Sequence, residues 1–327
     1  MQHRSVFTIS LREQPEIWDR LFADSPDATV FGSVRWLTLL ATVFGREAFA
    51  VIAGDPERPT AGIPVLQHRR GPLRLSSPLP ITLYAGILRS RGPALPLDDL
   101  LPTVERRLHF ASLNAVWSQE ERTALSSRGW ELRRRHTYRL DIDNTEQIWN
   151  GYSQSLRRKL RRVPAGGFRL DVDPPTAMIV RLFDQSYSRH GIRPPLPGVV
   201  LDRWLAELRR NNLAFCFAAC HPDGRPAAVR VVLRDGPRLF DWLAGSDPAV
   251  APSASHWLVH TILDRFSGEG CELFDFMGAN TPGVSDFKRG FGGSLFEYDE
   301  AEWYRPSLLR HLSALRNRRR RRWRGLP

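Results

Sequence analysis

The sequence predicts an α/β (α+β) protein of two similar domains, each a mixed, mostly antiparallel sheet flanked by helices. Two halves of the chain repeat one order of elements, in which helices are followed by strands. In the second half, turn residues separate three consecutive strands, a pattern typical of an antiparallel meander. The length of 327 residues and a hydrophobic fraction of 42 % suffice for two cores.

The first domain is predicted to cover residues 1–145. Its expected elements are helices over 15–22 and 34–44, strands over 48–54, 61–70 and 72–78, a helix over 97–110 and a strand over 137–142. The second helix is the clearest, because Trp36, Leu37 and Leu40 recur at helical spacing.

The second domain is predicted to cover residues 146–306. Its expected elements are helices over 145–163, 176–189 and 200–210, strands over 213–220, 227–233 and 239–245, a helix over 253–266, a strand over 271–278, a short helix over 284–291 and a strand over 294–305. The turns HPDGRP and RDGPR are rich in Gly, Pro and Asp, which is why the three central strands form a meander.

Positive charge is concentrated in a predicted basic tail, residues 307–327. The formal net charge is +12, and the seven arginines within 316–324 leave +5 for the rest. Such a tail is either simply solvated or binds RNA or an anionic membrane surface. The chain has no apolar run long enough to span a membrane, and residues 1–10 lack the apolar core of a signal peptide, so a cytoplasmic location is expected.

The three cysteines, Cys216, Cys220 and Cys271, are not expected to form a disulfide or a metal site. Cys216 and Cys220 lie four residues apart on a predicted strand, roughly 13 Å, which is too far for a bridge. They are interpreted as small buried apolar residues.

Several segments resemble FemAB-like proteins of the GNAT acyltransferase superfamily. Residues 245–279 followed by VSDFKRGFGG are similar to the C-terminal domain of that family, which carries an FKxxFG motif. FGSVRWLTLLATVFG, the Tyr84-Ala85-Gly86 segment and SLRRKLRR at 155–162 are similar to further family segments. The resemblance implies two tandem GNAT-like domains, an acceptor groove between them, and transfer of an activated acyl group to an amine.

Lys288 and Asp275 are the candidate catalytic residues. Lys288 and Phe287 match the motif, so the resemblance implies that Phe287 contacts the donor and that Lys288 holds donor phosphate or the developing oxyanion. Asp275 lies inside the apolar run LFDFMG, where a carboxylate needs a partner; it either acts as a base with a raised pKa or serves a structural role. Asp241 in LFDWLAG poses the same question.

Ser253, Ser255 and His256 begin a predicted helix where GNAT enzymes receive the pyrophosphate of acyl-CoA. The free N–H groups of a helix start bind anions, which makes the three residues donor-binding candidates. The glycine-bearing pyrophosphate loop of the superfamily is missing there, and RGFGGS at 289–294 is a near match in another place. Helix capping by the serines and a general-base role for His256 are the alternatives.

Acceptor-binding candidates come from three segments. A run of cations crowds one predicted helix and would be relieved by an anionic partner such as acceptor phosphate or tRNA, unless it is only a solvated face. Arg193 lies in the proline-rich loop IRPPLPG, and Tyr84 is implied by the resemblance. The residues proposed are Arg157, Lys159, Arg161, Arg193 and Tyr84.

Three functions remain open from the sequence. The first is an aminoacyltransferase that moves an aminoacyl group from aminoacyl-tRNA to an amine of a peptide, a cell-wall precursor or a specialised metabolite. The second is an acyl-CoA-dependent N-acyltransferase. In both the donor is a cosubstrate and no bound cofactor is expected. The third is a non-catalytic RNA- or membrane-binding module.

Overall fold

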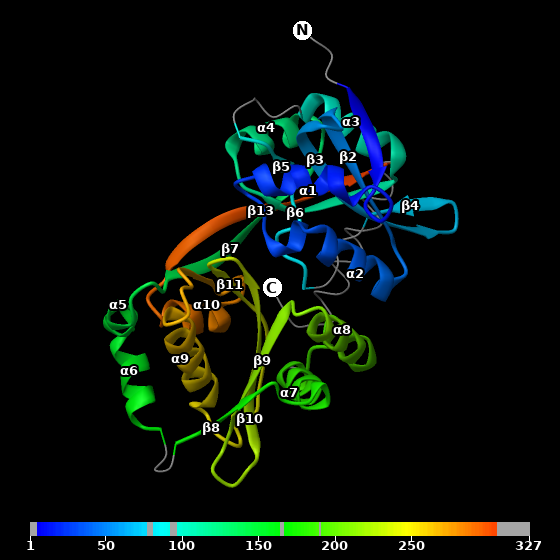
Figure 1. Ribbon diagram of the computed structural model, residues 1–327. Helices are drawn as coiled ribbons and strands as arrows, with labels where there is room; N and C mark the ends of the chain where they lie inside the picture. The colour runs from blue at the N-terminus through cyan, green and yellow to red at the C-terminus, as the bar shows by residue number, and fades with distance from the viewer. Residues whose placement is uncertain (1–4, 77–80, 92–96, 164–166, 190, 306–327) are drawn as a thin grey trace. The chain divides into compact units, whose positions relative to one another are not determined.

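A computed structural model describes residues 5–76, 81–91, 97–163, 167–189 and 191–305, and the basic tail lies outside these residues. The chain forms two compact units (Figure 1). Unit 1 comprises the residues up to Arg134 and those from Tyr298 onward, and unit 2 comprises Arg135–Glu297. The division therefore falls within two strands, β7 (Glu131–Asp141) and β13 (Ser294–Tyr304), rather than at the predicted helix start near residue 145.

Unit 1 is a mixed, mostly antiparallel sheet with helices. Its strands are ordered β1-β2-β3-β4-β6-β13, with β5 beside β3, and β4 and β6 are parallel. Its elements are β1 (Val6–Ser10), α1 (Pro15–Asp24), the 3-10 turn Val30–Gly32, α2 (Val34–Phe44), β2 (Glu47–Asp55), β3 (Arg58–Arg70), β4 (Leu73–Leu75), β5 (Leu88–Arg89), α3 (Leu97–Arg107), β6 (Phe110–Val116) and α4 (Gln119–Ser127).

Helix α2 shows how closely the sequence specifies this unit. Ser33 Oγ accepts a hydrogen bond from the backbone N–H of Trp36, which caps the helix start. Gly45 ends the helix in the left-handed conformation (φ 60°). Between them Trp36, Leu37 and Leu40 are buried, as their spacing predicts.

Unit 2 contains strands in mixed orientation, ordered β7-β12-β11-β10-β9-β8. All pairs are antiparallel except β11 with β12. Its remaining elements are α5 (Thr145–Gly151), α6 (Gln154–Arg161), β8 (Arg169–Val172), α7 (Thr176–Ser188), α8 (Gly198–Arg210), β9 (Ala214–Cys220), β10 (Pro226–Asp235), β11 (Arg238–Ser246), α9 (Ala254–Ser267), β12 (Leu273–Asp275) and α10 (Pro282–Arg289).

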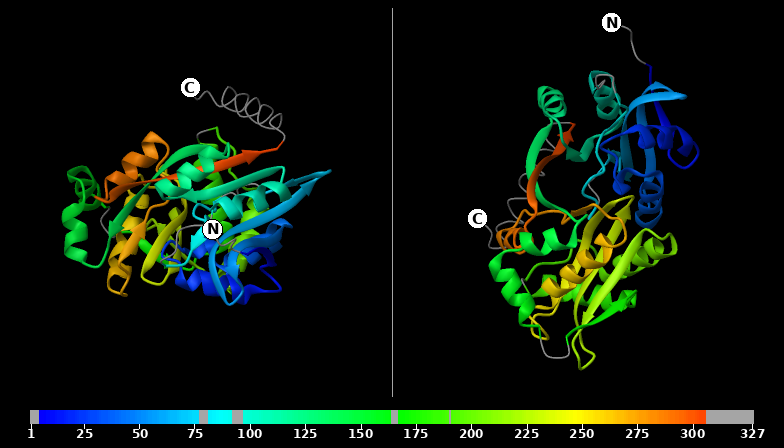
Figure 2. Two further views of the ribbon diagram at one scale, coloured as in Figure 1. Left: turned by 90° about the horizontal axis from the view of Figure 1, so that it is seen from above. Right: turned by 60° about the vertical axis from the view of Figure 1, so that its left-hand side comes forward.

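The helices of unit 2 cover both faces of its sheet. α7 packs on β10 and β11, and a Cβ on Gly245 of β11 would lie 2.6 Å from the α7 backbone, so only glycine fits there. α9 packs on β9, β10 and β11 from the other side, as the right panel of Figure 2 also shows, and α6 packs on α9. The predicted fold class of mixed, mostly antiparallel sheet with flanking helices is confirmed.

Two predicted elements differ from the structure. The helix expected over 145–163 is broken into α5 and α6, because Tyr152 is extended and Ser153 caps a new helix by accepting the N–H of Leu156. The strand expected over 271–278 ends at Asp275, where the Asp275 side chain accepts the N–H of Met277 and Met277 turns to φ 50°. β1, β5, β6, β8 and α4 were not predicted.

All three cysteines are buried free thiols, as expected. Within the described ranges, no helix combines the length and the apolar character that a membrane span requires.

Candidate functional site

The parallel strands β11 and β12 pair over only three residues of each strand. The last pair joins Phe240 to Asp275, after which β12 ends while β11 continues to Ser246. Four buried charged side chains gather where this pairing stops, and we call them the charged cluster: Arg230, Asp241, Asp275 and Lys288. Each is less than 10 % exposed, so each must find its partners within the protein.

Arg230 and Asp241 form a buried ion pair between neighbouring strands. The side chains are 6 % and 1 % exposed, and Arg230 Nη1 donates to Asp241 Oδ2 at 2.5 Å. A β-bulge brings them together: Val231 pairs with Leu243 and Val232 with Asp241, so Trp242 is an extra residue on β11. Burial raises the pKa of Asp241, and the positive charges of Arg230 and Lys288 oppose that rise.

Asp275 is fully occupied by structural partners. Its Oδ1 accepts from Thr137 Oγ1 at 2.7 Å and from the Met277 N–H at 2.8 Å, and its Oδ2 accepts from Arg139 Nε at 2.9 Å. These bonds tie the end of β12 to the neighbouring strand β7 and start the turn that follows. Its predicted base role stays a prediction, whereas the geometry assigns it a positioning role.

The buried ammonium of Lys288 donates hydrogen bonds to three successive backbone carbonyls. Its Nζ donates to the carbonyl oxygens of Phe276 at 2.6 Å, of Gly278 at 2.7 Å and of Met277 between them. Met277 and Gly278 are both left-handed (φ 50°), so the ammonium holds an unusual turn in place. Burial lowers the pKa of Lys288 to about 8, although Asp241 opposes the shift. The predicted oxyanion role would require Nζ to leave one of these carbonyls.

The first turn of α9 lies against the same cluster. Ser255 Oγ accepts from Arg230 Nη2 at 2.8 Å, and the His256 ring lies 4.6 Å from the Phe287 ring. His256 Nε2 is 3.5 Å from Lys159 Nζ of α6. Burial, followed by the charges of Lys159 and Arg230, lowers the pKa of His256 to about 4, so the imidazole is neutral near pH 7.

Three buried polar atoms in this region have no hydrogen-bond partner: Arg230 Nε, Asp241 Oδ1 and His256 Nδ1. A buried polar atom without a partner is costly, and proteins retain few of them. All three atoms lie near the point where β11 and β12 stop pairing.

The structure brings some predicted site residues together and leaves others apart. Lys288, Asp275, Phe287, Ser255, His256 and Lys159 lie in or against the charged cluster. Ser253 precedes α9 without capping it through its side chain, so the predicted serine cap is wrong for this residue. Arg161 and Arg193 are exposed, and Arg157 donates to the Asn150 carbonyl at 3.3 Å.

Tyr84 belongs to an aromatic core in unit 1. It is 3 % exposed and packs against Phe31, Trp117 and Tyr298 at ring distances of 5.8, 5.3 and 5.3 Å. Its predicted acceptor contact stays a prediction, and its packing in this structure is that of a core residue.

Sequence reasoning missed Arg230, which lies in the strand AAVRVVL among apolar neighbours. A charged residue inside a buried strand was a usable signal, since such a residue needs a partner of opposite charge. The rarity of lysine in this arginine-rich chain was a second signal for the site. Lys159 and Lys288 are the only lysines among the 47 lysines and arginines of the chain, and both contact this site.

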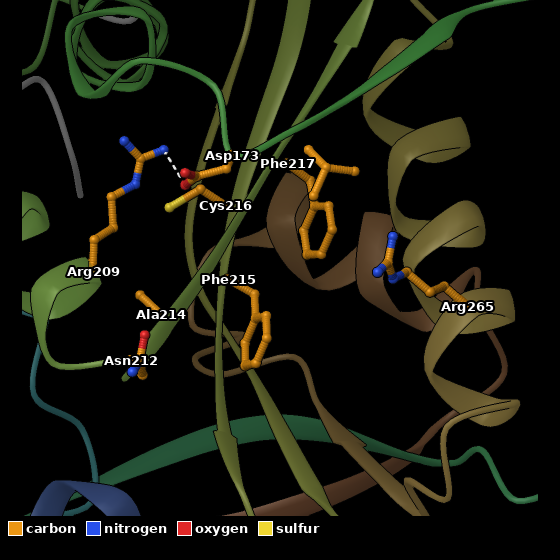
Figure 3. A pocket seen from close by; sticks show the side chains of 9 residues that line it. Asp173, Arg209, Asn212, Ala214, Phe215, Cys216, Phe217 and Arg265 are labelled. Atoms are coloured by element: carbon orange, nitrogen blue, oxygen red, sulfur yellow. Dashed lines mark ion pairs between the residues drawn. The ribbon is translucent and has the colours of Figure 1, made fainter.

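A pocket of about 240 Å³ lies elsewhere in unit 2 and shares no residue with the charged cluster (Figure 3). Asp173 and Arg209 form an ion pair of 2.6 Å on one side of it, and Phe215 and Phe217 line the other. Its one thiol, Cys216, has its pKa raised by burial and is therefore a poor nucleophile. The pocket offers no group suited to acyl transfer.

Comparison with known proteins gives a family match within unit 2. Residues 151–289 match the family described as Acetyltransferase (GNAT) domain. No curated protein matches the chain. The match identifies a GNAT-type acyltransferase domain in unit 2 and makes acyl transfer its reaction class.

Solved structures resemble the chain over nearly its whole length. The structure of FemX is 13 % identical, with 94 % of this chain and 99 % of that chain covered and a TM-score of 0.70. A tandem GNAT protein from the clavulanic acid biosynthesis pathway is 12 % identical (92 % and 98 % covered, TM-score 0.61). The C-terminal domain of a protein described as a lysylphosphatidylglycerol synthetase from Agrobacterium fabrum is 13 % identical (90 % and 92 % covered, TM-score 0.55). These likenesses show that the chain shares the fold of these structures.

Proposed function

We propose that unit 2 transfers an aminoacyl group from aminoacyl-tRNA to an amine, with the reaction at the charged cluster. The acceptor is an amine of a peptide, a cell-wall precursor or a specialised metabolite. The observation that carries the proposal is the set of unpartnered buried polar atoms on Arg230, Asp241 and His256 where β11 and β12 stop pairing.

Acyl transfer from an activated ester requires few catalytic groups. The donor ester is already activated, so the protein has to orient the amine, accept a proton and stabilise the oxyanion. Asp241 is the buried carboxylate with a raised pKa and an unoccupied oxygen, which are the properties of a proton acceptor. Lys288 and Asp275 act by holding the 275–278 turn beside it.

Two features favour tRNA as the donor. The segment between β11 and α9, residues 247–253, contains no glycine, so it lacks the loop through which the superfamily usually holds the pyrophosphate of CoA. Helix α6 carries Arg157, Arg158, Lys159 and Arg161, and its C-cap residue is Arg162. In the described part of the chain none of these cations forms an ion pair, and α6 packs on α9, whose first turn carries His256. An unpaired basic helix beside the site suits a polyphosphate backbone.

Acyl-CoA is the second candidate donor. The matching family is described as an acetyltransferase, and the clavulanic acid pathway structure is described as a form without AcCoA. A small acyl donor would use the charged cluster in the same way but would leave the cations of α6 without a role.

The two donors are compared side by side with the full-length protein. Labelled bulk aminoacyl-tRNA and labelled acetyl-CoA are offered with a panel of amino acids, peptides and amino sugars, and label transferred to the amine is measured. We expect transfer from aminoacyl-tRNA, and its loss in Asp241→Asn. Arg209→Gln, which breaks the ion pair of the distant pocket, is the matched control and should retain transfer.

Transfer from acetyl-CoA alone would replace the first candidate by the second. Binding of tRNA or vesicles without transfer of any label would favour the non-catalytic module, and would remove the catalytic assignment of the charged cluster.

A further inference from the structure

Acyl transfer passes through a tetrahedral intermediate whose oxygen carries a full negative charge and needs hydrogen-bond donors. Lys288 is poorly placed to be one of them. An ammonium has three N–H groups, and Lys288 directs its donors at the three carbonyls of Phe276, Met277 and Gly278. The donors to the oxyanion are therefore sought among the buried N–H groups that have no partner.

Arg230 supplies one such donor. Its Nη1 is used by Asp241 and its Nη2 by Ser255, while its Nε–H is buried and unpartnered. A guanidinium has no acceptor atom and stays protonated, so this nitrogen can only donate.

His256 supplies a second donor, and Lys159 determines which nitrogen carries the proton. The Lys159 ammonium can only donate, so His256 Nε2, 3.5 Å away, must be the acceptor. A neutral imidazole with an unprotonated Nε2 carries its proton on Nδ1. That Nδ1 is the buried nitrogen without a partner, so it is a donor in need of an acceptor.

The side chains that carry the two donors, Arg230 and His256, both lie close to the ring of Phe287. The Arg230 guanidinium carbon lies 5.2 Å from the centre of the Phe287 ring, and the His256 ring centre lies 4.6 Å from it. Arg230 Nη2 also donates a hydrogen bond to Ser255 Oγ, and Ser255 directly precedes His256. The side chains are therefore fixed next to each other by α9, β10 and α10.

We propose that the Nε–H of Arg230 and the Nδ1–H of neutral His256 donate the hydrogen bonds that stabilise the oxyanion of the transferred acyl group. This inference rests on the proposed acyl-transfer function and adds the groups that bind its intermediate. His256 then acts as an uncharged hydrogen-bond donor rather than as the general base.

In the transfer step a C–N bond forms and the C–O bond of the donor ester breaks. The nitrogen of the acceptor amine attacks the carbonyl carbon of the donor ester, and the π electron pair moves to the carbonyl oxygen, which receives the two hydrogen bonds. The C=O bond re-forms as the bond to the ribose oxygen breaks. The nitrogen gives up one proton, the ribose oxygen gains one, and an amide and a free hydroxyl result.

The surroundings suit a negative charge on that oxygen. Arg230, Lys288, Lys159 and Arg139 are positive, whereas Asp241 and Asp275 are negative, so the charged groups around the site sum to a net positive charge. Burial, followed by the charges of Lys159 and Arg230, lowers the pKa of His256 to about 4, which keeps the imidazole neutral and able to donate from Nδ1 alone.

The tautomer is measured directly by NMR. The full-length protein is labelled with 15N-histidine, and the His256 signals are identified by their loss in His256→Asn. We expect a protonated Nδ1 and an unprotonated Nε2 at pH 7. A proton on Nε2 would overturn the proposal, and this readout does not depend on any enzyme activity.

Two substitutions of His256 distinguish the contribution of Nδ1 to kcat from that of Nε2. Asn places an amide N–H near the position of Nδ1, whereas Gln places its amide near Nε2, where it still meets Lys159. We expect His256→Gln to lower kcat roughly a hundredfold with little change in KM, and His256→Asn to lower kcat less than tenfold. His221→Asn, at the turn between β9 and β10, is the control and should retain full activity.

Equal losses in the two variants, or a larger loss in His256→Asn, would overturn the role of Nδ1. A wild-type protein that transfers no acyl group from either donor would instead refute the proposed function, and the NMR result would then stand by itself. Unfolding temperatures of both variants show whether each loss of kcat occurs in a folded protein.

Discussion

Lys288 is a buried cation whose contacts stabilise a turn. The desolvation of its ammonium is offset by three carbonyl acceptors, and these carbonyls belong to a turn with two left-handed residues. The turn follows Asp275, so Lys288 and Asp275 fix the same few residues from opposite sides. A change at either residue is expected to disturb the site through this turn.

We expect Lys288→Met to lower both stability and turnover. Methionine has a similar length but no donor, so the three carbonyls lose their partner, at about 1–3 kcal/mol for each buried acceptor, less the relief of no longer burying a charge. A net loss of about 2–4 kcal/mol is expected in denaturant unfolding. Lys159→Met, at an exposed position, is the stability control.

The sequence motif alone predicts a different outcome, in which a Lys288 variant keeps its unfolding temperature and loses only turnover. That result would restore the oxyanion role to Lys288. Because the chain has two lysines, lysine-selective labelling gives two side-chain signals, and the signal of Lys288 should titrate near its pKa of about 8.

His256 should make the protein less stable as the pH falls from 6.5 to 4. Burial and the cations Lys159 and Arg230 lower its pKa from 6.5 to about 4, so in this window the unfolded chain binds a proton that the folded chain does not. The lowered pKa represents as much as about 3 kcal/mol of stability, present above pH 6.5 and lost toward pH 4.

The measurement compares urea unfolding of the wild type and His256→Asn across this range. Since the other acidic and basic groups are common to both proteins, the difference between them isolates His256. The advantage of the wild type should shrink as the pH falls, and a difference that stays constant with pH would contradict the lowered pKa.

At the scale of elements, α6 has an apolar face that is buried and a basic face that is exposed. Leu156 and Leu160 are buried and anchor it, while Arg158, Arg161 and Arg162 are exposed. Arg158 and Arg162 are four residues apart, a like-charge spacing that weakens an isolated helix by a few tenths of a kcal/mol. The helix retains these charges despite that cost, which fits binding of a polyanion.

We expect the double variant Arg158→Gln/Arg162→Gln to bind tRNA more weakly without a loss of stability. Each lost phosphate contact should reduce the slope of log affinity against log salt by roughly 0.7–0.9. Arg181→Gln/Arg203→Gln removes two exposed arginines from α7 and α8, on the other side of the unit 2 sheet (Figure 1), and is the matched control. Equal slopes in the two double variants would show that α6 binds no phosphates.

At the scale of the whole molecule, charge is distributed unevenly along the chain. The basic tail holds seven arginines within 316–324 and lies outside the described residues. Peripheral contact with an anionic membrane and contact with tRNA are the two partner predictions for the tail.

Deletion of residues 307–327 should leave the unfolding temperature unchanged and weaken binding to a polyanion. Titrations with tRNA and with vesicles containing anionic lipid are compared before and after deletion, each at several salt concentrations. A loss confined to tRNA, or confined to vesicles, identifies the partner of the tail. Unchanged affinity and salt dependence for both would remove the tail from binding.

The sequence by itself determined the elements with strong periodicity and their order, and hence the fold class. Helix α2 covers the predicted residues 34–44, and the meander β9–β11 follows from its turn residues. It also singled out Lys288 through the FKxxFG motif and Asp275 as a carboxylate inside an apolar run. Such signals are local, because propensity, capping and turn chemistry act within a few residues.

Only the tertiary structure decided what these residues contact. The pairing of Arg230 with Asp241 depends on a bulge at Trp242, and the state of His256 depends on Lys159, which is 97 residues away in the chain. Lys288 could not be assigned to three carbonyls before Met277 and Gly278 were known to be left-handed. Register, bulges and backbone conformation arise from packing between distant segments, and they determine which buried polar atoms are satisfied and which are left for a ligand.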